Sequence, residues 1–412
     1  MKRSNRRDRR SGERVRRRGR GDRPRGRGDG TLSTGRGDEV CRIARPEVGE
    51  DTRGWGQPFM AGAAGATTAE SAYFLSTNRG KLSVCVDIKS AEGQATLKAL
   101  AADCDVLIEN FKAGDAARYG LGYDDIAAIN PALVYCSITG FGQTGPLRER
   151  PGYDFMIQAM AGLMSVTGQP DGAEGAGPQK VGVALTDIMT GLYATIGILA
   201  ALAERDRSGL GQHVDMALFD VTVATLANQA TNYLVGGINP TRLGNAHPNI
   251  VPYQSFVTND GHLVVAVGND SQYRRFVEVL GCPELADDPR FATNGDRVRN
   301  RDALVPLLQA KMLKRGKEEW LTLLEAAKVP AGPINSVAEV FAQPQVAARE
   351  MRVNVPHPQN PGLSLVGSPI KLSRTPVEYR SAPPTLGQPT EQVLSGLDIQ
   401  NTIAQTEDTG TL

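Results

Sequence analysis

The chain has few of the side chains from which disulfide frameworks and metal centres are built. Its 412 residues include only five cysteines and four histidines. The number of cysteines is odd, no pair has CxxC spacing, and no two histidines lie three or four residues apart. These shortages argue against a disulfide framework and a zinc site, so we expect reduced thiols, a cytoplasmic protein and no bound metal. The residues concerned are Cys41, Cys85, Cys104, Cys136, Cys282, His213, His247, His262 and His357.

Long apolar runs are absent as well. Apolar residues make up 40% of the chain, which is enough to bury hydrophobic cores. No uninterrupted run reaches the roughly 18 apolar residues that a membrane-spanning helix needs, so we expect none. A chain of this length is most simply divided into two domains of ordinary size.

Charge is distributed unevenly. Residues 1–38 hold 15 Lys and Arg against five Asp and Glu, a net charge of +10, whereas the remainder holds 31 against 40, a net charge of −9. Residues 1–40 are Arg/Gly-rich and are predicted to be disordered. Three hypotheses explain this segment. It is an arm that binds nucleic acid through phosphates, a targeting peptide, or the product of GC-rich DNA translated in a frame that is not native. We favour the third hypothesis, because ordinary protein sequence begins abruptly near Glu39.

The first half of the remaining chain alternates strands with helices. Ser90 is predicted to cap a helix that runs through Ala102, and a further helix covers Asp124 to Ile129. This alternation indicates a parallel α/β sheet, in which ligands bind where strands end. The ENF and TGFGQTG sequences are therefore candidate ligand edges. The predicted strands are Val40–Ile43, Lys81–Ile88, Asp105–Phe111 and the strand in ALVYCSITGFG.

One carboxylate, Asp187, precedes a long helix of small and apolar residues. We predict Asp187 at the N-cap of a helix that begins near Ile188 and has its apolar positions at Ile188, Leu192, Ile196 and Leu199. A helix N-terminus also favours an ionised carboxylate that is ready to attack. Local chemistry alone does not choose between a cap and a nucleophile.

The second half has a different texture. We predict a helix over Asp220–Val235, then a β-hairpin with its turn at Asn259–Gly261. Helices follow around Gln272–Leu280 and Ala303–Ala327, and the Pro-rich tail contains a strand-like LVGSPIKLS run. The predicted division is a large α/β domain at 41–229, a small α+β domain at 230–335, and a segment at 336–412 that returns to the large domain.

Several motifs occur in a characteristic order. They are DTRGWG, NRGKLSVCVDIKS, DVLIENFKAG, RYGLGYDDI, NPALVYCSITGFGQTGP, RPGYDFMIQAMAGLMSVTG, GVALTDIMTGLYA, SGLGQHVDMALFD and AGPINSVAEVFAQPQV. From about residue 42 to its end the chain resembles the class III CoA-transferases, the family of formyl-CoA:oxalate CoA-transferase and α-methylacyl-CoA racemase. The RLGNAHPNIVPYQSF and VGNDSQYRRF sequences look most like enzymes that move CoA from succinyl-CoA to another dicarboxylate.

The resemblance implies a fold, an activity and a nucleophile. The expected fold is a Rossmann-like parallel sheet with a smaller α+β domain, in an interlocked homodimer. The expected activity is CoA transfer from an acyl-CoA, such as succinyl-CoA, to a carboxylic acid; the CoA thioester is a substrate and no cofactor is permanently bound. Asp187 matches the catalytic aspartate, which forms acyl-anhydride and CoA-thioester intermediates, with the tetrahedral oxyanions stabilised by amides of the Gly loops.

The resemblance also assigns contacts to CoA and to the acceptor acid. Tyr153 stands where racemases have histidine, and tyrosine, with an ordinary pKa of about 10, is a poor base at neutral pH. Racemisation is therefore the disfavoured alternative within the family. The glycine-run loop of formyl-CoA enzymes is absent, which disfavours oxalate. The CoA contacts are Arg45, Val86, Lys89, Asn110, Phe111, Arg118, Tyr119 and Tyr153, and the acceptor contacts are Asn245 and His247 in a loop with Asn249.

The start of the chain departs from the family pattern. The resemblance implies an opening strand and helix that touch CoA, and here the Arg/Gly stretch stands in their place. This departure supports the frame hypothesis. The alternative from another functional class is nucleic-acid binding through the basic residues 1–38, which the acidic remainder makes the weaker candidate.

Overall fold

The computed structural model describes residues 39–63 and 65–395. The predicted disordered segment, residues 1–40, lies outside the described residues except for residues 39 and 40. The frame and nucleic-acid hypotheses concern the same segment. Contacts divide the described chain into a large unit, residues 39–153, 186–221 and 350–395, and a small unit, residues 154–185 and 222–349. The boundaries predicted at residues 229 and 335 stay a prediction.

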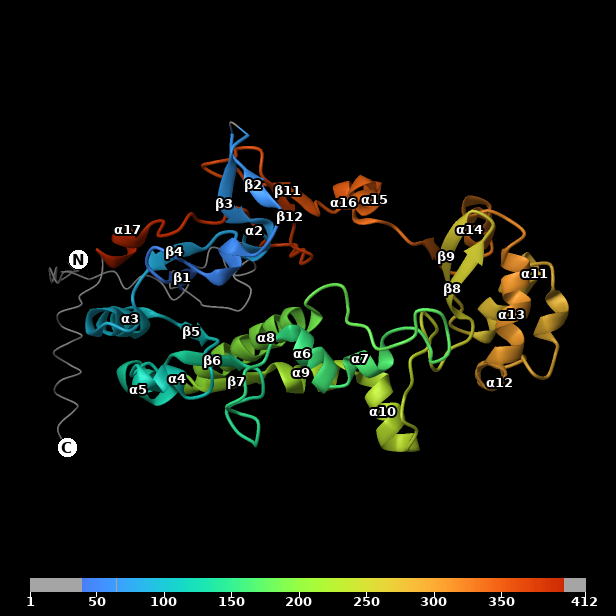
Figure 1. The fold of residues 1–412 in the computed structure, drawn as a ribbon, viewed down its shortest axis with the longest axis horizontal. Coiled ribbons are helices and arrows are strands. Elements are labelled where there is room, and N and C mark those ends of the chain that lie inside the picture. The colour runs from blue at the N-terminus through green and yellow to red at the C-terminus, as the bar shows by residue number, and fades with distance from the viewer. Residues whose placement is uncertain (1–38, 64, 396–412) are drawn as a thin grey trace, which may run out of the picture. The chain divides into compact units, whose positions relative to one another are not determined.

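The large unit contains parallel strands, as predicted (Figure 1). Strand β1 pairs with β4, and β5, β6 and β7 form a second sheet in that order. In the Rossmann strand order 3-2-1-4-5-6, β4 and β1 would be strands 3 and 2, and β5, β6 and β7 would be strands 4, 5 and 6. Strand 1 of that order would lie between β1 and β5. Within residues 39–63 and 65–395 no strand pairs with the other edge of β1 or of β5, so the sheet is in two pieces. The strands are β1 Cys41–Ala44, β4 Leu82–Cys85, β5 Val106–Glu109, β6 Val134–Thr139 and β7 His213–Ala217.

Helices cover both faces of the β5-β6-β7 sheet. Alternate residues of the strands, such as Val106, Val134 and Cys136, pack against α8, while Tyr135 packs on the opposite face with α3 and α5. Burial on both faces explains why these strands are nearly continuous apolar runs. The predicted cap is confirmed, since Ser90 Oγ accepts from the Gly93 amide at 2.9 Å. The helices of this region are α3 Ala91–Asp103, α4 Asp115–Arg118, α5 Tyr123–Ile129 and α8 Leu185–Ser208.

Helix α8 is apolar on more than one side. Its face on the sheet includes Ala194, Ile198 and Leu202. The apolar positions predicted from the sequence lie on another side of the helix and do not pack on the sheet. All four are exposed: Ile188, Leu192, Ile196 and Leu199. Within the described residues, α8 is also the one helix long and apolar enough to cross a membrane, by length and composition only. A helix that packs on a sheet in the core of an α/β unit has the same composition.

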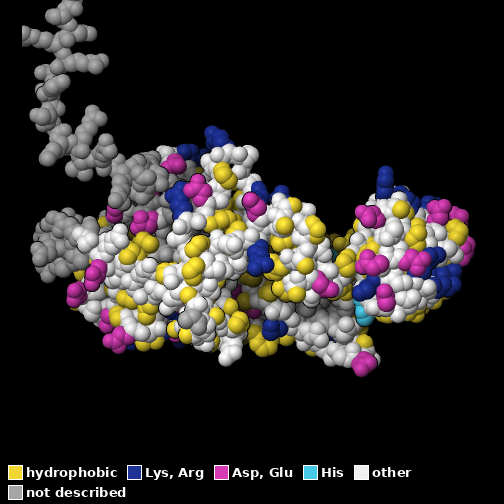
Figure 2. Space-filling model, turned by 90° about the horizontal axis from the view of Figure 1, so that it is seen from above, with side chains coloured by type: hydrophobic (Ala, Val, Ile, Leu, Met, Phe, Trp, Pro, Cys, Tyr) yellow, Lys and Arg dark blue, Asp and Glu magenta, His cyan; other side chains and the backbone are white. Residues whose placement is uncertain are grey.

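The small unit is built around an antiparallel sheet. The predicted hairpin is confirmed: β8 pairs with β9 in a register that joins Thr258 to Gly261, and β10 adds a third strand. Helices α11, α13 and α14 close a core that includes Phe276 and Trp320. Figure 2 shows charged side chains of both signs crowded on the outside of this part. The elements are β8 Tyr253–Thr258, β9 Gly261–Ala266, α11 Asp270–Val279, η2 Pro283–Ala286, α12 Asn294–Arg299, α13 Arg301–Met312, α14 Lys317–Ala326 and β10 Ala331–Pro333.

Two predicted helices are wrong in extent. The helix predicted over Asp220–Val235 is two helices, because the chain breaks at Ala227, whose φ of +47° lies in the left-handed region. The helix predicted over Ala303–Ala327 is likewise divided into α13 and α14. The further helices are α6 Asp154–Met160, α7 Leu163–Val166, α9 Leu218–Thr225, α10 Ala227–Gly236, α15 Val337–Ala342 and α16 Pro344–Ala348.

The C-terminal segment lies along β4. The Ser83 amide donates to Gln388 O at 2.9 Å, and the Cys85 amide donates to Thr390 Oγ1 at 3.0 Å. Residues 350–395 therefore pack with the first part of the chain in the large unit. The strand predicted in LVGSPIKLS is short and pairs with β11. The remaining elements are η1 Asp51–Gly54, β2 Phe59–Ala61, β3 Thr67–Ser71, α2 Ala72–Thr77, β11 Arg352–Asn354, β12 Ser364–Val366 and α17 Thr390–Leu394.

Candidate active site

Asp187 lies in the first turn of α8 and is exposed. The prediction that it is the N-cap is wrong, because the helix begins at Leu185, two residues earlier. The apolar lead-in already turns there, with the Leu185 amide donating to Val183 O at 2.8 Å. A carboxylate in the first turn still benefits from the positive end of the helix dipole, which favours its ionised form.

The direction of α8 places Asp187 at one edge of the sheet. Arg205, near the end of the helix, pairs with Asp105 at 2.9 Å, directly before β5 begins. The helix therefore runs antiparallel to the strands. The 18 residues from Arg205 back to Asp187 span roughly 27 Å, whereas the six residues of β6 span roughly 20 Å. Asp187 thus lies beyond the carboxyl ends of β5, β6 and β7, the edge at which α/β sheets bind ligands.

The Gly140–Gly145 loop leaves β6 at this same edge. Gly140 approaches Gly152 so closely that a Cβ on Gly140 would lie 2.6 Å from the Gly152 Cα. This contact carries the next residue, Tyr153, to the loop, where its side chain is 72% exposed. Gly140, at the start of the loop, and Tyr153, 13 residues later in the sequence, are therefore close in space.

The predicted CoA contacts follow the ends of other parallel strands. Arg45 follows β1 and Val86 follows β4, and these two ends meet, since the Val86 amide donates to Ala44 O at 3.0 Å. Val86 is buried, whereas Lys89 is exposed at the turn before α3. The Arg45 guanidinium is exposed and pairs with Asp51.

The remaining predicted CoA contacts follow β5. Asn110 is exposed, and Phe111 is 38% exposed, so Phe111 is not the core aromatic that its position after an apolar strand would normally make it. Arg118 ends α4 and pairs with Asp115 at 2.8 Å in an exposed ion pair. Tyr119 is half-buried against the cluster around Tyr135.

A row of polar side chains that was not predicted from the sequence lies on the strands that lead into these loops. Glu109, Ser137 and Asp215 are register neighbours on β5, β6 and β7. Burial raises the pKa of Glu109, and the nearby Asp215 carboxylate raises it further, while hydrogen bonds from Ser137 and the Phe111 amide act against this. Ser137 Oγ lies 2.9 Å from His213 Nε2, and Tyr123 stacks on the His213 ring. Polar residues at alternate positions near strand ends were the signal for this row.

In the small unit, the predicted acceptor loop is fastened on several sides. The Asn249 amide donates to His247 Nδ1 at 3.0 Å, and Asn245 Nδ2 donates to Ser255 Oγ at 3.0 Å. Arg301 donates to the His247 and Pro248 carbonyls at 3.3 and 2.7 Å. Burial lowers the pKa of His247, and the Arg301 charge lowers it further. Because Nδ1 accepts a hydrogen bond, the neutral ring carries its proton on Nε2.

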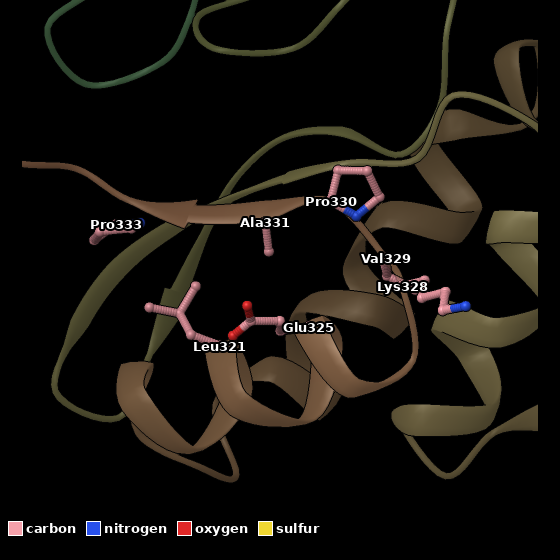
Figure 3. Close-up of a pocket in the computed structure, with 7 residues that line it drawn as sticks. All are labelled: Leu321, Glu325, Lys328, Val329, Pro330, Ala331 and Pro333. Carbon is pink, nitrogen blue, oxygen red and sulfur yellow. The ribbon is translucent and has the colours of Figure 1, made fainter. Parts of the chain in front are cut away.

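A pocket of about 510 Å³ also lies in the small unit (Figure 3). Its only charged lining groups are Glu325 and Lys328, and it contains none of the predicted site residues. We therefore do not place the reaction there. In residues 39–63 and 65–395, no group of three or more His, Cys, Asp or Glu side chains is arranged to hold a metal ion. The other lining residues are Leu321, Val329, Pro330, Ala331 and Pro333.

Comparison with known proteins assigns the family. The profile described as CoA-transferase family III matches residues 34–390. The chain belongs to this family. A succinate–glutarate CoA-transferase of Agrobacterium fabrum is 48% identical over 90% of this chain and 91% of its own. A succinyl-CoA:glutarate CoA-transferase of Homo sapiens is 42% identical over 87% of this chain and 79% of its own.

A solved structure supports the same assignment. A CaiB/BaiF family protein from Brucella suis is 45% identical, with a TM-score of 0.78, over 92% of this chain and 99% of its own. The expected α/β fold and the predicted family are thus confirmed. This family III protein is an acyl-CoA:carboxylate CoA-transferase, and the CoA thioester is its substrate.

The sheet edge of this transferase suits acyl transfer. It combines an exposed carboxylate in a helical first turn, a glycine-rich loop with backbone amides, and strand ends that carry the predicted CoA contacts. An attacking carboxylate needs access and stabilisation of its charge, and the oxyanion formed needs hydrogen-bond donors. At this edge, the exposure of Asp187 gives access, the N-terminus of α8 stabilises its charge, and the glycine-rich loop carries backbone amides.

Proposed function

We propose that the transferase moves CoA from succinyl-CoA to a second dicarboxylate of the glutarate type. The similarity to the named succinyl-CoA:glutarate enzymes over most of the chain carries this proposal. The placement of Asp187 at the ligand edge of the sheet supports it. Succinyl-CoA and glutaryl-CoA each carry one free carboxylate at the end of a short chain, so both can use one site, which suits a reversible exchange.

Asp187 is the nucleophile in the proposed reaction. Its carboxylate attacks the thioester carbonyl, the C–S bond breaks, and CoA thiolate leaves an aspartyl–succinyl anhydride. The thiolate then attacks the aspartyl carbonyl, giving an aspartyl-CoA thioester and free succinate. The acceptor carboxylate attacks that thioester, a second anhydride forms, and the returning thiolate releases the new acyl-CoA and Asp187. No water is consumed, so exclusion of water protects each intermediate.

We assign CoA binding to the residues at the strand ends of the large unit. Arg45, Lys89 and Arg118 are placed at the phosphates, for which guanidinium and ammonium groups are suited. Arg45 and Arg118 each hold an exposed ion pair, with Asp51 and Asp115. Such pairs are worth about 0–1 kcal/mol, so a phosphate can replace the carboxylate at little cost. The other residues of this assignment are Val86, Asn110, Phe111, Tyr119 and Tyr153.

The assembly of the transferase is proposed to be a homodimer in the cytoplasm. The exposed apolar residues Ile188, Leu192, Ile196 and Leu199 form a stripe along α8, and apolar stripes of this kind favour burial against a partner. A second copy of the chain is the proposed partner. All five cysteines are free thiols, which supports a reducing compartment.

The test is a panel of acceptors. Purified protein is incubated with succinyl-CoA and glutarate, hydroxymethylglutarate, malate or oxalate, and the CoA esters are measured by mass spectrometry. We expect glutaryl-CoA to form faster than any other product, and oxalyl-CoA to be the slowest. The proposal would be overturned if none of these acids received CoA while the protein, given a 2-methylacyl-CoA of one configuration in place of succinyl-CoA, converted it to a mixture of both configurations.

His247 is proposed to hold the distal carboxylate of the acceptor, together with Asn245. Its Nε2–H is the donor that the loop leaves for a ligand, since Nδ1 is engaged by Asn249. His247→Ala is expected to raise the KM for glutarate about ten- to a hundredfold, the value of a hydrogen bond to a charged group. The KM for succinyl-CoA in the first half-reaction stays within about threefold of wild type.

The conservative variant and the pH profile distinguish this role from a structural one. His247→Gln retains an N–H donor and is expected to recover at least part of the loss. Because the pKa of His247 is lowered from its ordinary value of 6.5, the ring is neutral at pH 7.5 and above, and the KM for glutarate is expected to be flat from pH 7.5 to pH 8.5. A KM that rises steeply with pH there would identify the imidazolium as the ligand group and contradict the assignment.

A further inference from the structure

The Gly140–Gly145 loop is held from below by two side chains on neighbouring strands. Thr139 Oγ1, at the end of β6, accepts from the Gly142 amide at 2.8 Å. Asp215 Oδ2, on β7, accepts from the Gln143 amide at 3.0 Å. Two successive amides of the loop are therefore fixed by side-chain acceptors that differ in chemistry and come from different strands.

Gly142 passes directly over the Asp215 carboxylate. A Cβ on Gly142 would lie 3.6 Å from Asp215 Oδ2. The Gly142 φ of +86° lies in the left-handed region, which residues other than glycine adopt only with strain. The loop conformation thus depends on two residues: Gly142, which adopts the left-handed backbone, and Asp215, whose carboxylate binds the next amide.

Asp215 belongs to the same row as Glu109 and Ser137. Glu109 Oε2 accepts from the Phe111 amide at 2.7 Å, so the row also holds the turn that follows β5. Ser137 Oγ in turn lies 2.9 Å from His213 Nε2, which ties the row to the imidazole at the start of β7. One polar row thus anchors both loops at the candidate ligand edge.

This anchoring limits which amides can serve the reaction. The Gly142 and Gln143 amides are already bound, so neither is a donor to an oxyanion. The amides of Thr144 and Gly145 follow immediately in the chain. An oxyanion donor must be placed to within a fraction of an ångström, and a misplacement of about 1 Å costs about a hundredfold in rate.

We propose that Asp215 is a positioning residue for CoA transfer: its carboxylate, with Thr139, fixes the Gly140–Gly145 loop so that Thr144 and Gly145 present their amides to the oxyanion. This role rests on the proposed function. The important property of Asp215 is that it accepts a hydrogen bond from Gln143; its charge is secondary. A side chain that keeps an acceptor oxygen at the same place should therefore keep the reaction.

The experiment compares Asp215→Ala with Asp215→Asn. We expect Asp215→Ala to lower kcat about 10- to 100-fold, with the KM for succinyl-CoA within about threefold of wild type. Asp215→Asn is expected to stay within about threefold in kcat. Amide hydrogen exchange of the peptide spanning residues 140–147 gives a second readout: exchange at Gln143 accelerates at least about tenfold in the alanine variant and not in the asparagine variant.

Asp124→Ala is the matched control. Asp124 also lies near His213 but holds no loop amide, so its loss removes a comparable charge without releasing the loop. If Asp215→Ala has the kcat of Asp124→Ala, or if Asp215→Asn is as impaired as Asp215→Ala, the proposal is overturned. Should Asp215→Ala fail to fold, Thr139→Val removes the second acceptor with little change of shape, and unchanged kcat and exchange in that variant would overturn the proposal equally.

The two readouts separate this proposal from the function on which it rests. A wild-type protein that transfers CoA to no acid would refute the proposed function, whereas hydrogen exchange needs no turnover. Faster exchange in Asp215→Ala would then still support the anchoring of the loop. Unchanged exchange would refute the anchoring whatever the activity.

Discussion

Asp187→Ala is expected to abolish CoA transfer, with a loss of about four orders of magnitude or more in kcat, as when other covalent nucleophiles are removed. The reason is that both anhydrides and the CoA thioester are formed on this carboxylate in the proposed mechanism. Asp187→Asn should be equally inactive, because an amide does not attack a thioester at a useful rate. Both are measured by glutaryl-CoA formation from succinyl-CoA and glutarate.

The covalent intermediate gives this prediction an independent check. Wild-type protein mixed with succinyl-CoA alone, then denatured in acid, is expected to carry bound CoA on the peptide that contains Asp187. Neither variant should carry it, although both should fold, with a stability within about 1 kcal/mol of wild type, the usual contribution of a carboxylate at a helix N-terminus. Bound CoA on another peptide, or transfer retained within about tenfold in Asp187→Ala, would show that a different residue is the nucleophile.

The case of Asp187 illustrates how far the sequence reaches. Its position at the start of a helix was predictable, because small and apolar residues continue for about four turns after it. Its place within the first turn was not, since the helix start depends on how Val183 and Leu185 turn. The side of α8 that packs on the sheet was not predictable either. Helix α8 is apolar on several faces, and periodicity alone does not say which face meets a sheet and which meets another partner.

Other differences have similar causes. The strands were predictable from their apolar runs, and the hairpin from Asn259 and Asp260 in its turn. The break at Ala227 was not, because alanine is a strong helix former and tertiary context overrides its propensity there. The Glu109–Ser137–Asp215 row was missed because its members are 28 and 78 residues apart and only strand register brings them together.

Arg53→Met is expected to destabilise the large unit by about 3–5 kcal/mol, the cost of removing one partner from a buried ion pair. Arg53 is buried, donates to Glu50 at 2.6 Å and to both oxygens of Glu70 at 2.7 Å, and lies over the Phe74 ring. It also donates to Pro384 O at 3.2 Å, joining the start of the chain to the C-terminal segment. Thermal and urea unfolding measure the loss. Arg148→Met, at an exposed ion pair with Glu149, is the control and should change stability by less than about 1 kcal/mol.

The pH dependence of this loss identifies its cause. Burial raises the pKa of Glu70 above its ordinary value even with Arg53 present, and for Glu50 the charges of Arg42 and Arg53 outweigh burial and lower the pKa. Without Arg53 both pKa values rise, so as pH falls the folded variant binds more protons than the folded wild type, while the unfolded chains bind the same number. The difference in stability from wild type should therefore shrink between pH 7.5 and pH 5. A difference that stays constant over that range would mean that Arg53 stabilises the unit through its packing on Phe74, because packing energy does not depend on the protonation of the two glutamates.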